Sequence, residues 1–214
     1  MKRMFLLACV LLAACSQSAR APVARTNGVY LLLDTSGTYR AELNKAQDVI
    51  LYTLSRLEPA DTFAVARIDT GSFTEKNIIA KATFDERPSA ANAQKRAFAE
   101  KVKDFVARAN ASQYTDITGG LLQAVEFLNE KNTGRKTILL FSDLDQDLKK
   151  GYVRDFDVPF QGVQVVALNV VKLRKDNYDP KEYLGRLEHW KEEVEKSGGK
   201  WRVVNDLDRL DGVL

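Results

Sequence analysis

The sequence predicts an α/β domain with a central, mainly parallel β-sheet and helices on both faces. Short, wholly apolar runs recur along the chain, the first at residues 28–33 and a later one at residues 137–141. Such runs are typical of strands that are buried on both faces of a sheet. Segments with the apolar spacing of helices separate them, and this alternation is the pattern of a three-layer, doubly wound fold.

The expected elements follow one another from the first apolar run to the C-terminus. A helix carries Leu43 and Ala46 on one face and ends at Pro59. Strands are expected at residues 62–68 and 78–84, and a short linker with a glycine joins them, so the second should be an antiparallel edge strand. The remaining expected elements are helices at 90–109 and 118–129, strands at 137–141 and 163–171, a helix opened by Pro180, and a strand at 201–204.

The N-terminal segment has the composition of a bacterial secretion signal. Lys2 and Arg3 precede an apolar run at residues 4–12, which is too short to span a bilayer as a stable helix. A positive start followed by a short apolar run and small residues is typical of segments that are removed during secretion.

A cysteine ends this signal. Residues 12–15, Leu-Ala-Ala-Cys, resemble the bacterial lipobox. The resemblance implies that residues 1–14 are the signal peptide and that Cys15 is diacylated and becomes the first residue of the mature protein. Ser16 follows it, which by the same resemblance favours the outer membrane over the inner membrane. The alternative is an ordinary signal with an incidental cysteine.

The rest of the chain divides into a tether and one domain. Residues 15–27 are the lipidated cysteine with a small, polar, unpatterned segment, and residues 28–214 are long enough for one sizeable core. The other of the two cysteines, Cys9, lies within the signal, so the mature part has no disulfide and no cysteine metal site. The formal net charge of +3 falls to +1 without Lys2 and Arg3, which leaves no basic footprint for nucleic acid.

Three polar clusters lie at the ends of expected elements. Asp34, Ser36 and Thr38 come directly after the first strand. Thr115 comes just before a helix, and Asp143 directly after a later apolar strand. Ligands of open α/β sheets bind beyond the carboxyl ends of strands, so the clusters meet if these two strands are neighbours. Their carboxylate and hydroxyl oxygens suit Mg²⁺, Mn²⁺ or Ca²⁺ and disfavour zinc and copper.

These clusters resemble the motifs of the von Willebrand factor type A family. Residues 34–38, Asp-Thr-Ser-Gly-Thr, resemble its Asp-x-Ser-x-Ser motif. Thr115 matches the family's single distant threonine, and Asp143 matches its second aspartate, which also follows an apolar strand. The resemblance covers residues 28–214 in the order of motifs and elements. It implies a Rossmann-like fold with a metal-ion-dependent adhesion site at these five positions, where a partner's aspartate or glutamate completes the coordination of Mg²⁺.

Two positions depart from the family pattern, and three residues are candidates for the rim of the site. Thr38 replaces the usual second serine and retains its hydroxyl group. Leu144 stands where a glycine commonly follows the second aspartate, which bears on the class of partner more than on the metal. Asp69, Tyr39 and Leu144 are the rim candidates. A solvated loop charge is the alternative for Asp69, and packing is the alternative for the other two.

The best interpretation is a membrane-anchored, divalent-metal-dependent adhesion or scaffold module of the cell envelope, not an enzyme. Its expected partners are a protein with an Asp or Glu carboxylate and the membrane, not nucleic acid. One alternative is a phosphatase, because an apolar strand ending in Asp34 also resembles the haloacid dehalogenases. That family needs a second aspartate as general acid where this chain has Ser36, which cannot supply the proton transfer near neutral pH. The other alternative is a metal-free scaffold.

Overall fold

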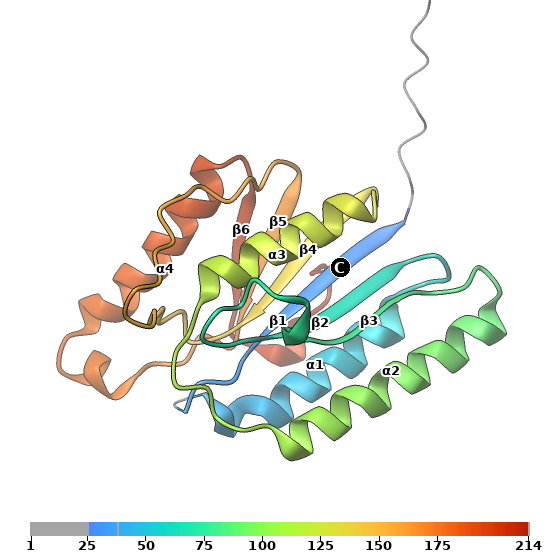
Figure 1. Cartoon of the computed structure of the whole chain (residues 1–214), viewed down its shortest axis with the longest axis horizontal. Helices are drawn as coiled ribbons and strands as arrows, with labels where there is room; N and C mark the ends of the chain where they lie inside the picture. The colour runs from blue at the N-terminus through green and yellow to red at the C-terminus, as the bar shows by residue number, and fades with distance from the viewer. Residues whose placement is uncertain (1–25, 38, 214) are drawn as a thin grey trace, which may run out of the picture.

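The computed structural model describes residues 26–37 and 39–213 and confirms the expected fold class (Figure 1). The signal, Cys15, the tether up to residue 25, and Thr38 lie outside the described residues. The boundary between tether and domain at residues 27 and 28 stays a prediction. None of the helices in the described part of the chain combines the length and the apolar character that a membrane crossing needs.

The described residues form one sheet of six strands. All neighbouring strands are parallel except β2 and β3, so β3 is the antiparallel edge strand that the short linker predicted. The strands are β1 (Asn27–Asp34), β2 (Thr62–Ile68), β3 (Ile78–Thr83), β4 (Arg135–Phe141), β5 (Val163–Leu168) and β6 (Lys200–Val204), in the spatial order β3-β2-β1-β4-β5-β6.

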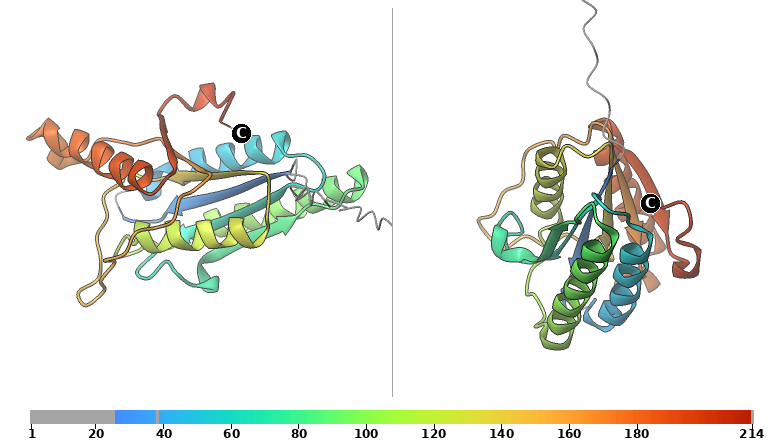
Figure 2. Two further views of the ribbon diagram at one scale, coloured as in Figure 1. Left: turned by 90° about the horizontal axis from the view of Figure 1, so that it is seen from above. Right: turned by 90° about the vertical axis from the view of Figure 1, so that its right-hand side faces the viewer.

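Four longer helices cover the two faces of the sheet. They are α1 (Leu43–Arg56), α2 (Pro88–Arg108), α3 (Ile117–Glu130) and α4 (Pro180–Lys196). The apolar side chains of α1 and α2 pack in one buried cluster, and those of α3 and α4 pack in another. Figure 2 shows α1 and α3 on opposite sides of the strands. The result is the three-layer arrangement expected from alternating strands and helices.

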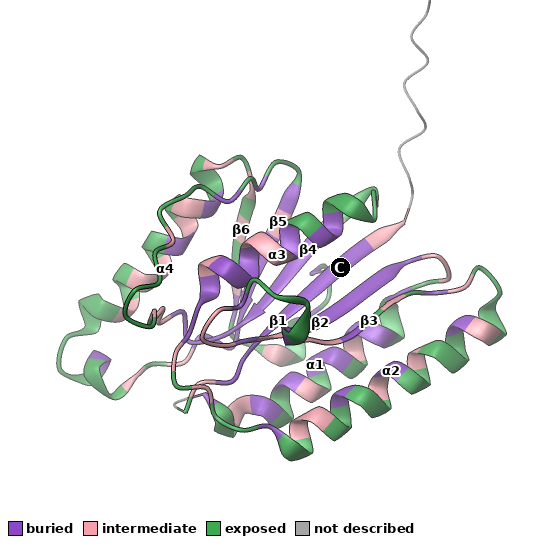
Figure 3. Cartoon of the chain, in the orientation of Figure 1, coloured by how far each residue is buried: buried purple, intermediate pink, exposed green. Residues whose placement is uncertain are grey.

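The position of β1 in the middle of the sheet explains why residues 28–33 are wholly apolar. Successive side chains of a strand point to opposite faces. Leu31 and Leu33 belong to the cluster under α1 and α2, whereas Tyr30 and Leu32 belong to the cluster under α3 and α4. Both faces of β1 are therefore buried, and Figure 3 shows the central strands as buried along most of their length.

One expected strand is shorter than its apolar run. The strand expected at residues 163–171 ends as β5 at Leu168. Asn169 has a φ of 52°, in the left-handed region, which turns the chain out of the sheet, and its N–H donates to the carbonyl of Val204 at 3.1 Å. The apolar residues Val170 and Val171 continue the core beyond the strand, so composition alone overestimated its length.

The topology brings the carboxyl ends of β1 and β4 together. Leu33 pairs with Phe141, so Asp34 and Ser142 lie at the same level on adjacent strands. The chain leaves β1 toward β2 on one side and leaves β4 toward β5 on the other, and this is the switch point at which open α/β sheets bind ligands. The β4–β5 connection, residues 142–162, contains no helix and forms a long surface loop beside this point.

Candidate functional site

Asp34 is a fully buried carboxylate at the end of β1. Its exposed fraction is 0%. Oδ1 accepts a hydrogen bond from the Ser36 N–H at 2.8 Å, and Oδ2 accepts one from the Ser142 hydroxyl at 2.6 Å. The Ser142 hydroxyl also accepts from the Leu144 N–H at 3.0 Å. Asp34 therefore ties the end of β1 to the segment that follows β4.

The environment of Asp34 disfavours its negative charge. Burial raises the pKa of Asp34, and the hydrogen bonds from Ser142 and Ser36 oppose that rise only in part; the charge of Asp145 adds to it. Within residues 26–37 and 39–213, no lysine or arginine forms an ion pair with Asp34. A buried carboxylate without a counter-charge is costly, and a nearby cation would remove that cost.

Asp143 lies on the neighbouring strand end and is also buried, with an exposed fraction of 2%. Its Oδ1 accepts from the Asp145 N–H at 3.0 Å. The next residue, Leu144, has a φ of 67°, in the region that favours glycine. The backbone therefore has the conformation suited to the glycine that commonly follows the second aspartate in von Willebrand factor type A domains, although the residue here is leucine.

Backbone hydrogen bonds join the segment that carries Thr115 to the segments after β1 and β4. The Thr115 N–H donates to the Asp147 carbonyl at 2.8 Å, and the Asp147 N–H donates back at 3.0 Å. The Ser112 N–H donates to the Thr35 carbonyl at 2.8 Å. These bonds connect the segments after β1, before α3 and after β4 at one edge of the sheet. Four sequence-predicted ligand residues lie on these segments: Asp34, Ser36, Thr115 and Asp143.

Two of the three rim candidates are buried in the core. Tyr39 has an exposed fraction of 0%; its hydroxyl donates to the Asn169 carbonyl at 2.6 Å, and its ring meets Phe141 edge to face at 5.4 Å. Leu144 is buried in the cluster under α3 and α4. Both side chains therefore pack in the core, and a place for either of them beside the ion stays a prediction.

Asp69, the third rim candidate, is partly exposed at the end of β2. Its Oδ1 accepts from the Ser112 hydroxyl at 2.7 Å, and its Oδ2 pairs with Arg67 at 2.8 Å. Burial alone would raise the pKa of Asp69, but the hydrogen bonds from Ser112 and Thr70 and the charge of Arg67 lower it overall. Asp69 therefore stays charged and helps to fix the segment before α3.

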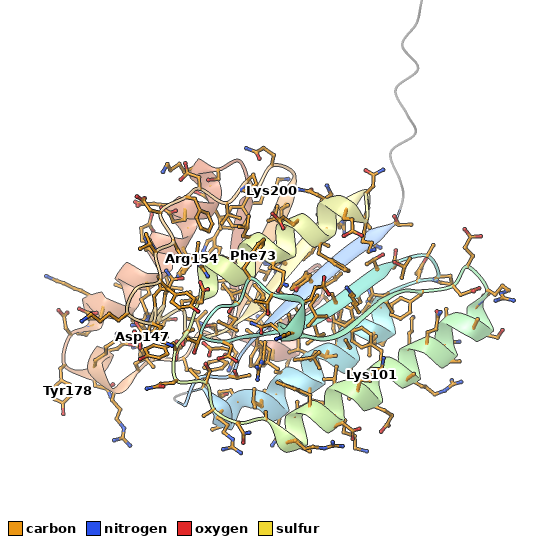
Figure 4. The ribbon with its side chains drawn as sticks, viewed as in Figure 1. Phe73, Lys101, Asp147, Arg154, Tyr178 and Lys200 are labelled. Atoms are coloured by element: carbon orange, nitrogen blue, oxygen red, sulfur yellow. The ribbon has the colours of Figure 1, made fainter. Side chains whose placement is uncertain are left out.

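Sequence reasoning missed a buried ion pair beside the site. Arg154 lies in the β4–β5 loop (Figure 4). It donates to both carboxylate oxygens of Asp116, at 2.6 Å in its shortest contact. Asp116 is also the N-cap of α3, where it accepts from the Gly119 N–H at 2.9 Å, and it accepts from the Ser72 N–H at 3.1 Å. An aspartate before a helical apolar run is a capping signal, but no local pattern could indicate Arg154 as its partner.

A second buried ion pair stabilises the other side of the same edge. Arg186 of α4 donates to both oxygens of Asp176 at 2.8 Å, and the Asp176 side chain is fully buried. Asp176 lies in the short helix η3 (Arg174–Asn177). The hydrogen bonds from Arg186 lower the pKa of Asp176 to about 2, against the effect of burial.

This pair should contribute to stability against acid. A carboxylate whose folded pKa is depressed stabilises the fold above its unfolded pKa, near 4, and loses that contribution as the pH falls through its folded pKa, about 2. We expect the free energy of unfolding to drop between these two pH values, and to drop less in the Asp176→Asn/Arg186→Met variant. Urea unfolding of both proteins across this range measures the difference; equal slopes would contradict the assignment.

Comparison with known proteins supports the fold. No family model and no curated protein matches the sequence. A von Willebrand factor type A protein from Catenulispora acidiphila matches 87% of this chain with a TM-score of 0.50 and 17% identity. The pilus adhesin SpaC from Lactobacillus rhamnosus GG matches 88% of it with a TM-score of 0.53 and 12% identity. The matches span 40% and 29% of those two chains. The chain therefore has a von Willebrand factor type A-like fold.

Proposed function

We propose that this chain is a divalent-metal-dependent protein-binding module of the bacterial cell envelope. The observation that carries the proposal is the fully buried Asp34, which has no ion-pair partner among the described residues and lies beside the end of β4, where Asp143 follows. Three segments of the chain converge on this edge, at the switch point of a von Willebrand factor type A-like sheet. A bound cation would supply the charge that this edge lacks.

The side chains at this edge offer the types of oxygen ligand that a hard divalent cation prefers. Among residues 26–37 and 39–213, no three His, Cys, Asp or Glu side chains are grouped as a metal site. An ion here would therefore depend on two carboxylates together with the hydroxyls of Ser36, Thr38 and Thr115 and on water. Mg²⁺ accepts such a set, since it uses few carboxylates and retains waters. When bound, it would provide an electrophilic centre for a carboxylate of the partner.

Neighbouring residues fix the orientation of Asp34 and leave one side of the proposed site accessible. The hydrogen bonds from Ser36 and Ser142 fix the orientation of the Asp34 carboxylate. Ser36 is half-buried and Gly37 is exposed, so the turn after β1 is the accessible side of the site. A partner would therefore approach over this turn.

The position of the site suits an N-terminal anchor. β1 starts at Asn27 and runs from the amino edge of the sheet to Asp34 at the carboxyl edge (Figure 1). A lipid on Cys15 would attach the domain through the amino edge. The metal site would then face away from the membrane, toward a partner. We propose the outer membrane as the destination because Ser16 follows the cysteine.

The proposal is tested with the mature, EDTA-treated protein. Calorimetric titration with Mg²⁺, Mn²⁺ and Ca²⁺ should show uptake of an ion, and pull-downs from envelope extract should lose their partner when EDTA is present. Partners that persist in EDTA, with no uptake of ion, would identify a metal-free scaffold. Hydrolysis of a generic phosphate ester that depends on Asp34 would identify a phosphatase instead.

Lipidation gives a separate prediction. Cys15→Ala should either release the protein from the membrane fraction or leave its signal misprocessed, because the acyl chains provide the anchor. Cys9→Ala is the matched control, since it removes the other cysteine and leaves the lipobox intact. Membrane fractionation and mass spectrometry of the mature N-terminus measure both variants. Unchanged membrane association of Cys15→Ala, with a normal signal cut, would contradict the lipobox.

A further inference from the structure

Two side chains of α4 donate hydrogen bonds to successive carbonyl groups in residues 142–144, the site loop that follows β4. Arg186 Nε donates to the carbonyl of Asp143 at 3.1 Å, and Trp190 Nε1 donates to the carbonyl of Leu144 at 3.1 Å. Residues four apart on a helix lie on the same face, so one face of α4 holds both peptide groups. Neither donor is among the residues that the sequence motifs single out.

Both donors are themselves fixed. The two terminal nitrogens of Arg186 are bound to Asp176, which leaves Nε directed at the Asp143 carbonyl. Asp176 in turn accepts from the Leu173 N–H at 2.6 Å. The side-chain exposed fraction of Arg186 is 9%, and Trp190 is 3% exposed. The orientation of the two donors is therefore set by the packing of α4 and η3.

The loop that they hold is strained and links the two acidic groups of the site. Leu144 has a φ of 67°, a conformation that persists for leucine only when the surroundings impose it. Its N–H donates to the Ser142 hydroxyl, which donates to Asp34. A relaxation of residues 142–144 would therefore displace Asp143 directly and would change the hydrogen bonding of Asp34.

We propose that Arg186 and Trp190 are positioning residues for the metal site. They hold the peptide groups of Asp143 and Leu144, and so the affinity of the site for a divalent ion depends on α4. This inference rests on the proposed function, because it concerns the same site. Removal of groups that orient metal ligands typically weakens metal binding by roughly 10- to 100-fold.

The choice of variant must separate the hydrogen bond from the charge of Arg186. Arg186→Met alone removes a positive charge near Asp143 and leaves Asp176 buried without its partner. Asp176→Asn/Arg186→Met removes both charges of the pair, so the net charge near the site is unchanged. Asp176→Asn is avoided as a lone change, because it would leave Arg186 without its counter-charge. Trp190→Phe removes the second donor without any change of charge and retains an aromatic ring.

The matched control is Val194→Ala. Val194 is a fully buried residue of α4 and has no hydrogen bond to the site loop through its apolar side chain. Its truncation destabilises the packing of the same helix by an amount typical of two lost buried methyl groups. It therefore shows what a general weakening of α4 does to ion binding.

The experiment is calorimetric titration of wild type and the three variants with Mn²⁺ and Mg²⁺, well below each thermal midpoint. We expect the double variant and Trp190→Phe to bind the ion roughly 10- to 100-fold more weakly than wild type, and Val194→Ala to bind it as wild type does. If circular dichroism shows that the double variant is not folded, Trp190→Phe decides alone.

The contrary outcomes are distinct. If wild type binds the ion and the variants match its affinity, the positioning role is wrong and the proposed function stands. The role is also wrong if Val194→Ala loses as much affinity as the others, since the effect then belongs to helix stability. If wild type takes up no ion, the proposed function fails and the positioning role fails with it.

Discussion

Replacing Asp34 with alanine is expected to abolish uptake of Mg²⁺ and Mn²⁺ and capture of the partner, while the protein stays folded. The side chain is fully buried at the switch point and supplies one of the two carboxylates of the site. Without it, Asp143 alone would have to balance the ion. The core clusters do not depend on Asp34, so the fold should survive. Calorimetric titration and pull-down of the variant measure the two losses.

The asparagine variant separates binding from stability. Asp34→Asn has nearly the same shape but no charge, so it should also fail to bind the ion. In EDTA it should be more stable than wild type, because the buried charge without a counter-ion is gone. A gain of about 1 kcal/mol would raise the thermal midpoint by roughly 2–4 °C in a domain of this size.

Asp61 provides the matched control for this experiment. It is buried like Asp34, with an exposed fraction of 2%, but lies at the start of β2, at the opposite edge of the sheet. It accepts hydrogen bonds from Asn27 and Glu58. Asp61→Asn should leave ion uptake intact. If Asp34→Ala binds the ion as wild type does, the proposed site is wrong, whatever the result for the control.

Replacing Asp116 with alanine is expected to produce the largest loss of stability. The change removes the N-cap of α3, the acceptor of the Ser72 N–H and the partner of Arg154, whose side chain is only 18% exposed. Breaking a buried ion pair costs about 3–5 kcal/mol, and loss of a cap adds about 1 kcal/mol. Urea unfolding followed by circular dichroism should therefore show a loss of roughly 4 kcal/mol or more.

Asp116→Asn tests the origin of that loss. Asparagine is a good N-cap and can still accept from Ser72, so this variant isolates the missing charge. It should lose less stability than alanine, and the double variant Asp116→Asn/Arg154→Met should recover part of the loss, since no buried charge remains unpaired. A loss below about 1 kcal/mol in Asp116→Ala would mean that the ion pair does not stabilise the fold.

Much of the fold could be predicted because local sequence patterns indicate which side chains are buried. The apolar runs at β1 and β4 predicted strands buried on both faces, and both are buried there. Pro180 marked the start of α4, because proline is tolerated in the first turn of a helix. The clusters after β1 and β4 could be placed at the carboxyl edge from strand direction alone, since all parallel strands end at one edge.

The contacts that shape the candidate site could only be decided by the tertiary structure. The sequence left open whether β1 and β4 are neighbours, and their pairing is what brings Ser142 to Asp34. It also left open whether Tyr39 and Leu144 are buried, and only the tertiary structure shows that both lie in the core.

The partners of Asp116 and of the Asp143 carbonyl, Arg154 and Arg186, are 38 and 43 residues away in the chain. Local periodicity determines which face of an element is buried, because each element buries its own apolar side. It carries no information on which distant charge or donor that face will meet, since this depends on how all the elements pack together.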